Sequence, residues 1–140
     1  MMGSLEISAS GLRAQRMIMD VISQNIANAS TTRDASGNPS PYRRQEVLLR
    51  VGDPRLGVPN QGVSVADIVK DNTTEFIKKY EPNHPDAVTT GKDKGYVYYP
   101  NVNVMHEMVD MIVATRAYEA NITAMDAAKS MAEASLRILA

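Results

Sequence analysis

The 140-residue sequence contains no cysteine, no tryptophan and a single phenylalanine. Without cysteine the chain has no disulfide, no thiolate nucleophile and no cysteine ligand for a metal. The scarcity of large aromatic side chains argues against a conventional compact core, whereas nine methionines and many alanines suit the packing of helix on helix. We therefore expect one mainly helical protein rather than an enzyme built around a large core.

Excess charge and long apolar runs are also missing. The formal net charge is −1, which gives no electrostatic reason to expect nucleic acid or an anionic membrane as a partner. Residues 1–6 lack the basic segment of a Sec signal peptide. No run approaches the roughly 20 apolar residues of a membrane-spanning helix. The sequence predicts a protein with no Sec signal and no direct membrane insertion.

Proline and glycine are distributed unevenly and divide the chain into three segments. The first 33 residues have no proline, residues 104–140 have neither residue type, and all seven prolines lie between residues 37 and 100. Because both residues interrupt helices, we expect a helix, a β and loop insert, and a second helix. The expected boundaries are residues 1–33, 34–101 and 102–140, with the two helical segments forming one coiled-coil domain.

Both helical segments contain an apolar stripe with a heptad repeat, which is typical of a helix that packs along another helix. We interpret this first stripe as the seam between the two helices of an intramolecular coiled-coil hairpin. Its residues are Leu5, Leu12, Met19, Ile26, Met108, Met111, Tyr118, Ile122, Met125, Ala132, Leu136 and Leu139.

A second stripe follows the same period on another side of each helix. A helix that is apolar on two faces is usually buried on two sides, so this second stripe is predicted to contact neighbouring subunits. Its many alanines would allow backbones to approach closely. Its residues are Ile7, Ile18, Val21, Val109, Val113, Ala120, Ala124, Ala127, Met131 and Ile138.

The long insert lets the chain reverse, so the two helices are expected to run antiparallel. Pairing positions whose numbers sum to 144 brings the heptad layers into line, with Leu12 opposite Ala132 and Met19 opposite Met125. The layers then balance in volume, because a small residue faces a large one and the two methionines can adapt to each other.

The insert has the pattern of a small β module. Residues 42–51 are rich in β-forming residues, and residues 62–69 alternate between apolar and small polar residues. Together they predict a β-hairpin with a ten-residue connection. Residues 76–80 are a candidate third strand, and residues 95–100 are expected to be extended chain that leads into the last helix.

Two short motifs at the end of the insert predict local structure. Residues 82–86 contain two prolines with asparagine and aspartate, a composition typical of a turn. Asn101 or Asn103 can act as the N-cap of the last helix, because an asparagine side chain accepts hydrogen bonds from the first free backbone amides.

Candidates for chemistry are few. His106 and Asp110 are four residues apart on a helix, but two ligands without a third do not make a metal site. His84 lies close to Asp86, where a turn with exposed polar residues explains the pair as well as acid–base chemistry does. The chain has no nucleotide-binding motif and no arrangement of a catalytic triad. We predict no enzymatic activity, no cofactor and no metal.

Several stretches resemble motifs of the bacterial flagellar rod and hook protein family. Residues 23–32 (SQNIANASTT) resemble its N-terminal signature, and residues 114–122 (ATRAYEANI) its C-terminal motif. Residues 80–86 (YEPNHPD) and 95–104 (GYVYYPNVNV) are similar to the narrower signature of the short proximal-rod subunits. The motif positions singled out are Asn25, Asn28, Pro82, Asn83, Pro85, Tyr99, Pro100, Asn101, Arg116, Tyr118 and Asn121.

The resemblance implies a structural subunit of the flagellar basal body, stacked helically into the hollow periplasmic rod that transmits motor torque and encloses an export channel. Implied partners are further copies of the chain, other proximal-rod subunits, the adaptor at the rod base that connects to the membrane-embedded MS ring, and the flagellar type III export machinery. Export by that route agrees with the missing Sec signal. The alternative is a helical adaptor or secretion chaperone, which would form a discrete dimer.

Overall fold

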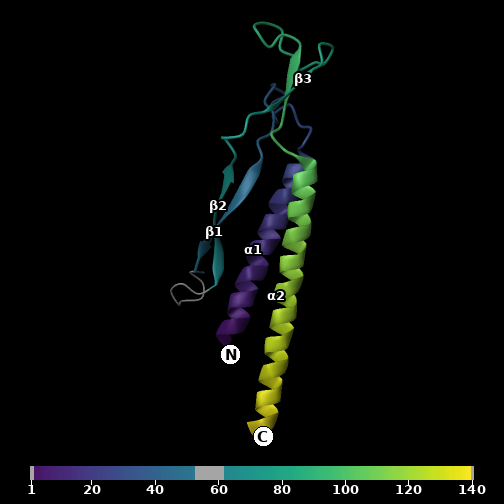
Figure 1. Cartoon of the computed structure of the whole chain (residues 1–140). Helices are drawn as coiled ribbons and strands as arrows, with labels where there is room; N and C mark the ends of the chain where they lie inside the picture. The colour runs from purple at the N-terminus through teal and green to yellow at the C-terminus, as the bar shows by residue number, and fades with distance from the viewer. Residues whose placement is uncertain (1, 53–61, 140) are drawn as a thin grey trace.

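The computed structural model describes residues 2–52 and 62–139. Figure 1 shows two long helices side by side, a β-hairpin along the first helix, and a smaller strand pair beyond the helix ends. None of the helices in the described residues has the length and apolar character needed to cross a membrane. The elements are α1 (Met2–Ala27), β1 (Gln45–Val51), β2 (Val63–Lys70), β3 (Ile77–Tyr80), β4 (Tyr96–Tyr99) and α2 (Val104–Leu139).

Asparagine side chains determine where each helix stops or starts. Helix α1 ends at Ala27, earlier than the expected residue 33, where the backbone and side-chain amides of Asn28 donate to the Gln24 carbonyl at 3.0 and 2.9 Å. Asn103 Oδ1 accepts hydrogen bonds from the amides of Met105 (3.0 Å) and His106 (3.3 Å) just before α2. These bonds satisfy amides that have no partner within the helix. The prediction of an asparagine N-cap is confirmed, and the residue is Asn103.

Strands β1 and β2 form the predicted antiparallel hairpin, whose connection lies mostly outside the described residues. The register shifts between the pair Leu48–Asp67 and the pair Leu49–Val65, so Ala66 is an extra residue in β2. Because the bulge lies in β2, alternation along β1 is preserved. Leu49 therefore points to the same face as Val47, and Leu48 points to the opposite face.

The second strand pair was only partly predicted. The third strand expected within residues 76–80 is β3. Residues 95–100 were expected to be extended chain without a partner strand, but they contain β4, which pairs antiparallel with β3. Gly95 makes this pairing possible: it has a φ of 84°, and an added Cβ would lie 2.8 Å from Tyr80 Cε2. Only glycine adopts this φ at no steric cost while leaving room for the Tyr80 ring.

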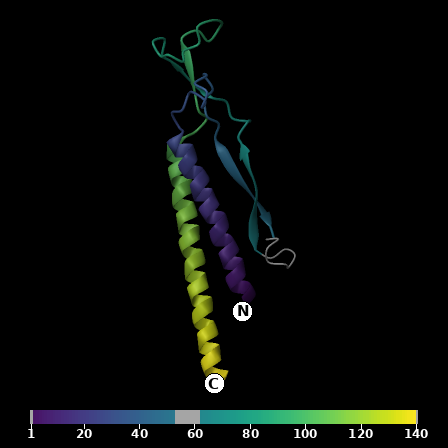
Figure 2. The same ribbon diagram turned by 180° about the vertical axis from the view of Figure 1, so that it is seen from behind.

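Helices α1 and α2 run antiparallel, as Figure 1 and Figure 2 show, but the predicted register is wrong. Asn25 bonds to Glu107 at 3.0 Å, and the Met19 sulfur lies 3.7 Å from Thr115 Oγ1. An added Cβ at Gly11 would lie 3.1 Å from Asn121 Nδ2. The paired numbers sum to 132 or 134 rather than 144. A polar bond and a glycine contact determine this register, whereas the prediction relied on large apolar layers.

Burial is concentrated near the end of the helices where the insert joins them. In the described residues the buried apolar side chains are Ala14, Val21, Ile22, Val97, Val102 and Ala114. Two of them are the alanines that the composition suggested for helix packing, whereas none of the described buried apolar side chains is a methionine. Many larger apolar side chains of α2 and of the hairpin remain exposed in the single chain.

Candidate functional site

A buried polar junction, formed by Asn25, Tyr42, Arg44, Asn101 and Glu107, joins both helices to the insert. Asn25 on α1 is 1% exposed, and its Nδ2 donates to the Gln45 carbonyl (2.9 Å) and to Glu107 Oε2 (3.0 Å). Its Oδ1 accepts from the Gln45 amide and from the Tyr42 hydroxyl, both at 2.9 Å. One amide side chain thereby connects α1, β1 and α2.

Glu107 is the charged centre of the polar junction. It is 1% exposed, and its Oε1 accepts from Arg44 Nε at 2.5 Å. Arg44 also pairs with Glu46, and with Asp110 at 3.7 Å. Partial burial alone would lower the pKa of Arg44, but the hydrogen bond and charge of Glu107 outweigh it and raise that pKa. Burial, and next the charge of Glu107, raise the pKa of Tyr42. A buried carboxylate needs such partners.

Asn101 closes the polar junction on the side of the insert. Its Oδ1 accepts from the Arg44 amide at 2.9 Å, and its Nδ2 donates to the carbonyls of Asp71 (3.2 Å) and Thr74 (3.4 Å). The preceding Pro100 is fully buried. The motif around residue 100 therefore fixes the chain between the β module and α2.

The predicted turn at residues 82–86 is anchored by its last residue, Asp86, which is not among the motif positions singled out above. Asp86 accepts from Thr32 Oγ1 at 2.8 Å and from Arg33 Nε at 2.6 Å, which ties the turn to the chain just after α1. The Thr32 bond, and then Arg33, lower the pKa of Asp86. His84 Nδ1 accepts from the Asp86 amide at 3.1 Å, so this pair is part of the turn. Pro82, Asn83 and Pro85 are exposed around it.

The remaining motif residues lie at separate places. The Tyr99 hydroxyl donates to Glu81 Oε2 at 2.9 Å, and Asn28 Oδ1 accepts from Thr31 Oγ1 at 3.2 Å. On α2 the Arg116 side chain is 78% exposed and pairs with Glu119 at 2.9 Å. The motif residues Tyr118 and Asn121 on the same helix are half-buried.

The first stripe only partly faces α1 in the single chain. Its α1 members Leu5, Leu12, Met19 and Ile26 are half-buried, as are Met111, Tyr118, Met125 and Ala132 on α2. Met108, Ile122 and Leu136 are exposed instead, because the positions one residue earlier, such as Glu107 and Asn121, turn toward α1. The Leu139 side chain lies outside the described ones. The stripe of α2 that faces α1 therefore keeps the heptad period, but every second position lies one residue earlier in the chain than predicted.

The second stripe is mostly exposed, with one clear exception. Val21 is 3% exposed and packs inside the chain, so it is not available to a neighbouring subunit. Ile18 is half-buried. Ile7, Val109, Val113, Ala120, Ala124, Ala127 and Met131 are exposed, while the Ile138 side chain lies outside the described ones. Two further exposed residues, Met105 and Ile112, were not predicted, because neither belongs to the two stripes identified from the sequence.

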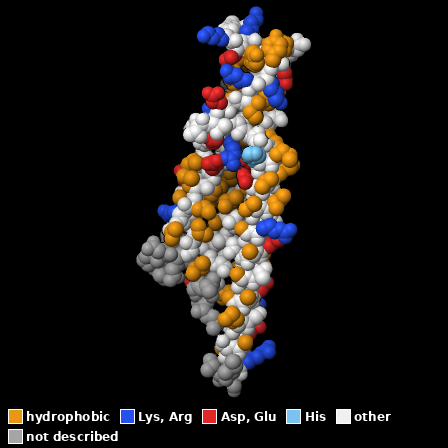
Figure 3. Space-filling model, viewed as in Figure 1, with side chains coloured by type: hydrophobic (Ala, Val, Ile, Leu, Met, Phe, Trp, Pro, Cys, Tyr) orange, Lys and Arg blue, Asp and Glu red, His pale blue; other side chains and the backbone are white. Residues whose placement is uncertain are grey.

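Two apolar surfaces therefore remain open. The outer face of α2 comprises Met105, Met108, Val109 and Ile112, which are between 49 and 70% exposed. The central groove, of about 370 Å³, runs between the β1–β2 hairpin and α2. Figure 3 shows hydrophobic side chains gathered there. Its apolar lining residues are Ile18, Val21, Ile22, Val47, Val113 and Ala114.

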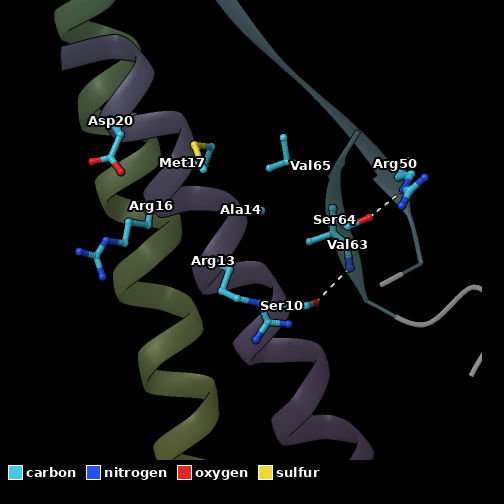
Figure 4. Close-up of a pocket in the computed structure, with 10 residues that line it drawn as sticks. All are labelled: Ser10, Arg13, Ala14, Arg16, Met17, Asp20, Arg50, Val63, Ser64 and Val65. Carbon is cyan, nitrogen blue, oxygen red and sulfur yellow. Dashed lines mark hydrogen bonds between the residues drawn. The ribbon is translucent and has the colours of Figure 1, made fainter. Parts of the chain in front are cut away.

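A second cavity, of about 490 Å³, lies between α1 and the hairpin (Figure 4). Ser10 Oγ accepts from the Val63 amide at 3.0 Å and donates to the Ile7 carbonyl at 2.6 Å, which fastens the hairpin to α1. Arg50 Nε donates to Ser64 Oγ at 3.0 Å across the hairpin. The labelled arginines do not point to a common centre.

Acidic and histidine side chains do not gather into a metal centre in the part of the chain that the structure describes. His106 and Asp110 have no third ligand there, which leaves the expectation about metals unchanged. The polar junction is a structural connection between elements, since its groups already satisfy one another.

Families of known proteins match the two end segments of this chain, and individual relatives match most of its length. Residues 5–33 match a family described as "Flagella basal body rod protein", and residues 93–138 match "Flagellar basal body rod FlgEFG protein C-terminal". The flagellar basal-body rod protein FlgC of Borreliella burgdorferi is 47% identical over 97% of this chain and 95% of its own length. FlgC of Bacillus subtilis is 43% identical over 96% and 95%, and FlgC of Salmonella typhimurium 37% over 90% and 88%. The chain belongs to the FlgC family of flagellar basal-body rod proteins.

Proposed function

We propose that the chain is a structural, non-enzymatic subunit of the proximal part of the flagellar rod. Its partners are further copies of itself, other proximal-rod subunits and the adaptor at the rod base, and it reaches the rod through the flagellar type III machinery. The assembled subunits enclose the export channel and transmit torque in the periplasm. Membership of the FlgC family supports this proposal.

The observation that carries the proposal is the outer face of α2. Four large apolar side chains on the first turns of this helix, Met105, Met108, Val109 and Ile112, are open to solvent in the single chain. Contiguous apolar patches of this kind mark interaction sites in soluble proteins. Residues 1–33 and 102–140 would then act together as a coiled-coil domain, with one side of the helix pair closed inside the chain and the other closed by neighbours.

The proposal is tested by replacing the chromosomal gene with variants. Ala127 is exposed on α2, so Ala127→Asp leaves the single chain folded but places a charge in a subunit contact. The strain should not swim, and the variant should be absent from purified basal bodies. The matched control is Glu133→Gln, also exposed on α2, which should swim normally.

Circular dichroism of both purified variants checks that the fold is retained. A motile Ala127→Asp strain would contradict the packing of the second stripe against a neighbouring subunit. A wild-type chain that is absent from basal bodies and forms a discrete dimer in solution would instead indicate the helical adaptor or secretion chaperone.

A further inference from the structure

We infer that the outer face of α2 in one copy of the chain packs into the central groove of a second copy. The inference rests on the proposed structural role in the rod and adds the contact through which two copies meet. It is an interaction between two different surfaces of the same chain, a convex helix face and a concave groove.

The central groove has the form that receives a helix. Its floor is the side of α1 that carries Ile18 and Ile22, one wall is β1 with Val47, and the other wall is α2 with Val113. Leu49 extends the β1 wall, since it lies two residues beyond Val47 on the same face of the strand and is exposed. The groove is lined by apolar and polar side chains together, and its apolar part is suited to the apolar face of another helix.

The outer face of α2 has the matching spacing. Met105, Val109 and Ile112 follow one another at four and three residues, so they form one ridge along the helix. Arg116 continues this ridge by a further turn. Its side chain is 78% exposed and pairs with Glu119 on the same helix.

Charge favours the same pairing. Glu46 and Asp110 lie on the rim of the central groove, and their side chains are 49 and 52% exposed. Both pair with Arg44, and together with the buried Glu107 the groove lining carries three carboxylates against that one guanidinium. The excess charge of the groove is therefore negative, whereas the ridge of α2 ends in the cation of Arg116. Opposite charges at the edge of an apolar contact fix its register and suppress wrong partners.

The two surfaces cannot meet within one chain, and their charges complement each other, so the occupant that we infer is a second copy. Glu107 turns toward α1, and at 3.6 residues per turn Met105 and Ile112 lie on roughly the opposite side of α2. The groove lies between α2 and the hairpin, so one chain cannot bring the two surfaces together. A contact between two different patches is heterologous, and heterologous contacts that do not close generate helical assemblies.

Two single-cysteine variants test the inference, since the natural chain has no cysteine. A strain expresses Ile112→Cys and a tagged Leu49→Cys together, and its purified basal bodies are oxidised. A disulfide needs Cα atoms within about 7 Å, so we expect a linked dimer of one tagged and one untagged chain. The matched control is tagged Leu48→Cys, on the opposite face of the same strand, which should not link.

The pair Val109→Cys and Val51→Cys provides a second test along the same two surfaces. Motility of the strain and the presence of both variants in its basal bodies test the proposed function independently of disulfide formation. If both are present and neither pair links, the inference is wrong while the proposed function stands. Dimers of Ile112→Cys with itself, equal linking by Leu48→Cys, or a link to a different rod subunit would also overturn it. If neither the variants nor the wild-type chain are found in basal bodies, the proposed function is wrong.

Discussion

Asn25 Nδ2 donates to Glu107 Oε2 at 3.0 Å and so joins two helices whose residues are 82 positions apart in the chain. The same asparagine makes three more hydrogen bonds, to both backbone groups of Gln45 and to the Tyr42 hydroxyl. A residue of the N-terminal family motif is thereby the point at which both helices and the hairpin are held together.

The Asn25→Ala variant should be strongly destabilised. Removing the amide leaves the Glu107 carboxylate, both Gln45 backbone groups and the Tyr42 hydroxyl short of a partner. An unsatisfied buried polar group costs about 1–3 kcal/mol, so a loss of several kcal/mol is expected in urea unfolding. Asn28→Ala is the control: its side chain bonds are exposed or partly buried, and it should cost less. Equal losses for the two variants would argue against the central role of Asn25.

The β3–β4 pair should depend on Gly95 for two separable reasons. Gly91 and Gly95 have φ values of 93° and 84°, but only at Gly95 does an added Cβ meet another residue, at 2.8 Å from Tyr80. Backbone strain of about 1–2 kcal/mol should appear in Gly91→Ala, and a larger loss in Gly95→Ala. Nuclear Overhauser effects between Tyr80 and Tyr96 should weaken in the second variant alone. If the two variants lose the same amount of stability, the close approach of Gly95 to Tyr80 makes no difference.

The Asp86 anchor should weaken in acid. The pKa of this carboxyl is lowered in the folded chain by Thr32 and then by Arg33. A lowered folded pKa gives stability that is complete above the ordinary value of 3.8 and disappears as pH falls through the folded pKa. Asp86→Asn should therefore be less stable than the natural chain at pH 6, and the two should converge near the lowest pH measured. A difference that stays constant with pH would contradict this account.

The overall plan was accessible from the sequence because it depends on local patterns. Missing proline in both end segments, and missing glycine in residues 104–140, predicted the helices. Residue alternation predicted the hairpin, and a capping asparagine predicted the start of α2. The polar junction was not predictable in this way. Asn25 was noticed as a motif residue, but Glu107 lies among apolar positions of α2 and no periodicity identifies its partners. Its bonds to Arg44 and Asn25 depend on tertiary contacts between distant segments.

Gly11 illustrates the same limit. Read as sequence, a glycine inside α1 weakens the helix, whereas the structure shows a close approach to Asn121. Gly11→Ala should therefore be nearly neutral, because about 1 kcal/mol gained in helix propensity is offset by pressure on the Asn121 amide. In the background of Asn121→Ala the same change should stabilise the chain. Additive effects in this double-mutant cycle would show that the two residues do not interact.

Protection from hydrogen exchange should decrease along α2. Its first part packs against the polar junction and contains the buried Glu107 and Ala114, whereas residues 122–124 and 129–131 are exposed in the single chain. Regions with few buried contacts open at lower free energy. Amides of residues 107–114 should therefore exchange more slowly than those of residues 122–137 in the isolated chain. Uniform protection along the helix in a verified monomer would contradict the prediction.

The register of the helix pair gives the most direct test of the fold. Met19 and Thr115 face each other, with sulfur and hydroxyl 3.7 Å apart. A chain with Met19→Cys and Thr115→Cys should form an intramolecular disulfide on oxidation, because facing positions bring the two cysteines within bonding distance. The control, Met19→Cys with Met125→Cys, matches the pairing that heptad layers alone predict. Its second position lies ten residues further along α2, about 15 Å at 1.5 Å per residue, and should stay reduced. Mass spectrometry of the monomer distinguishes the two chains. Linking by the control alone would restore the register with sums of 144, and would mean that Asn25 and Glu107 do not meet.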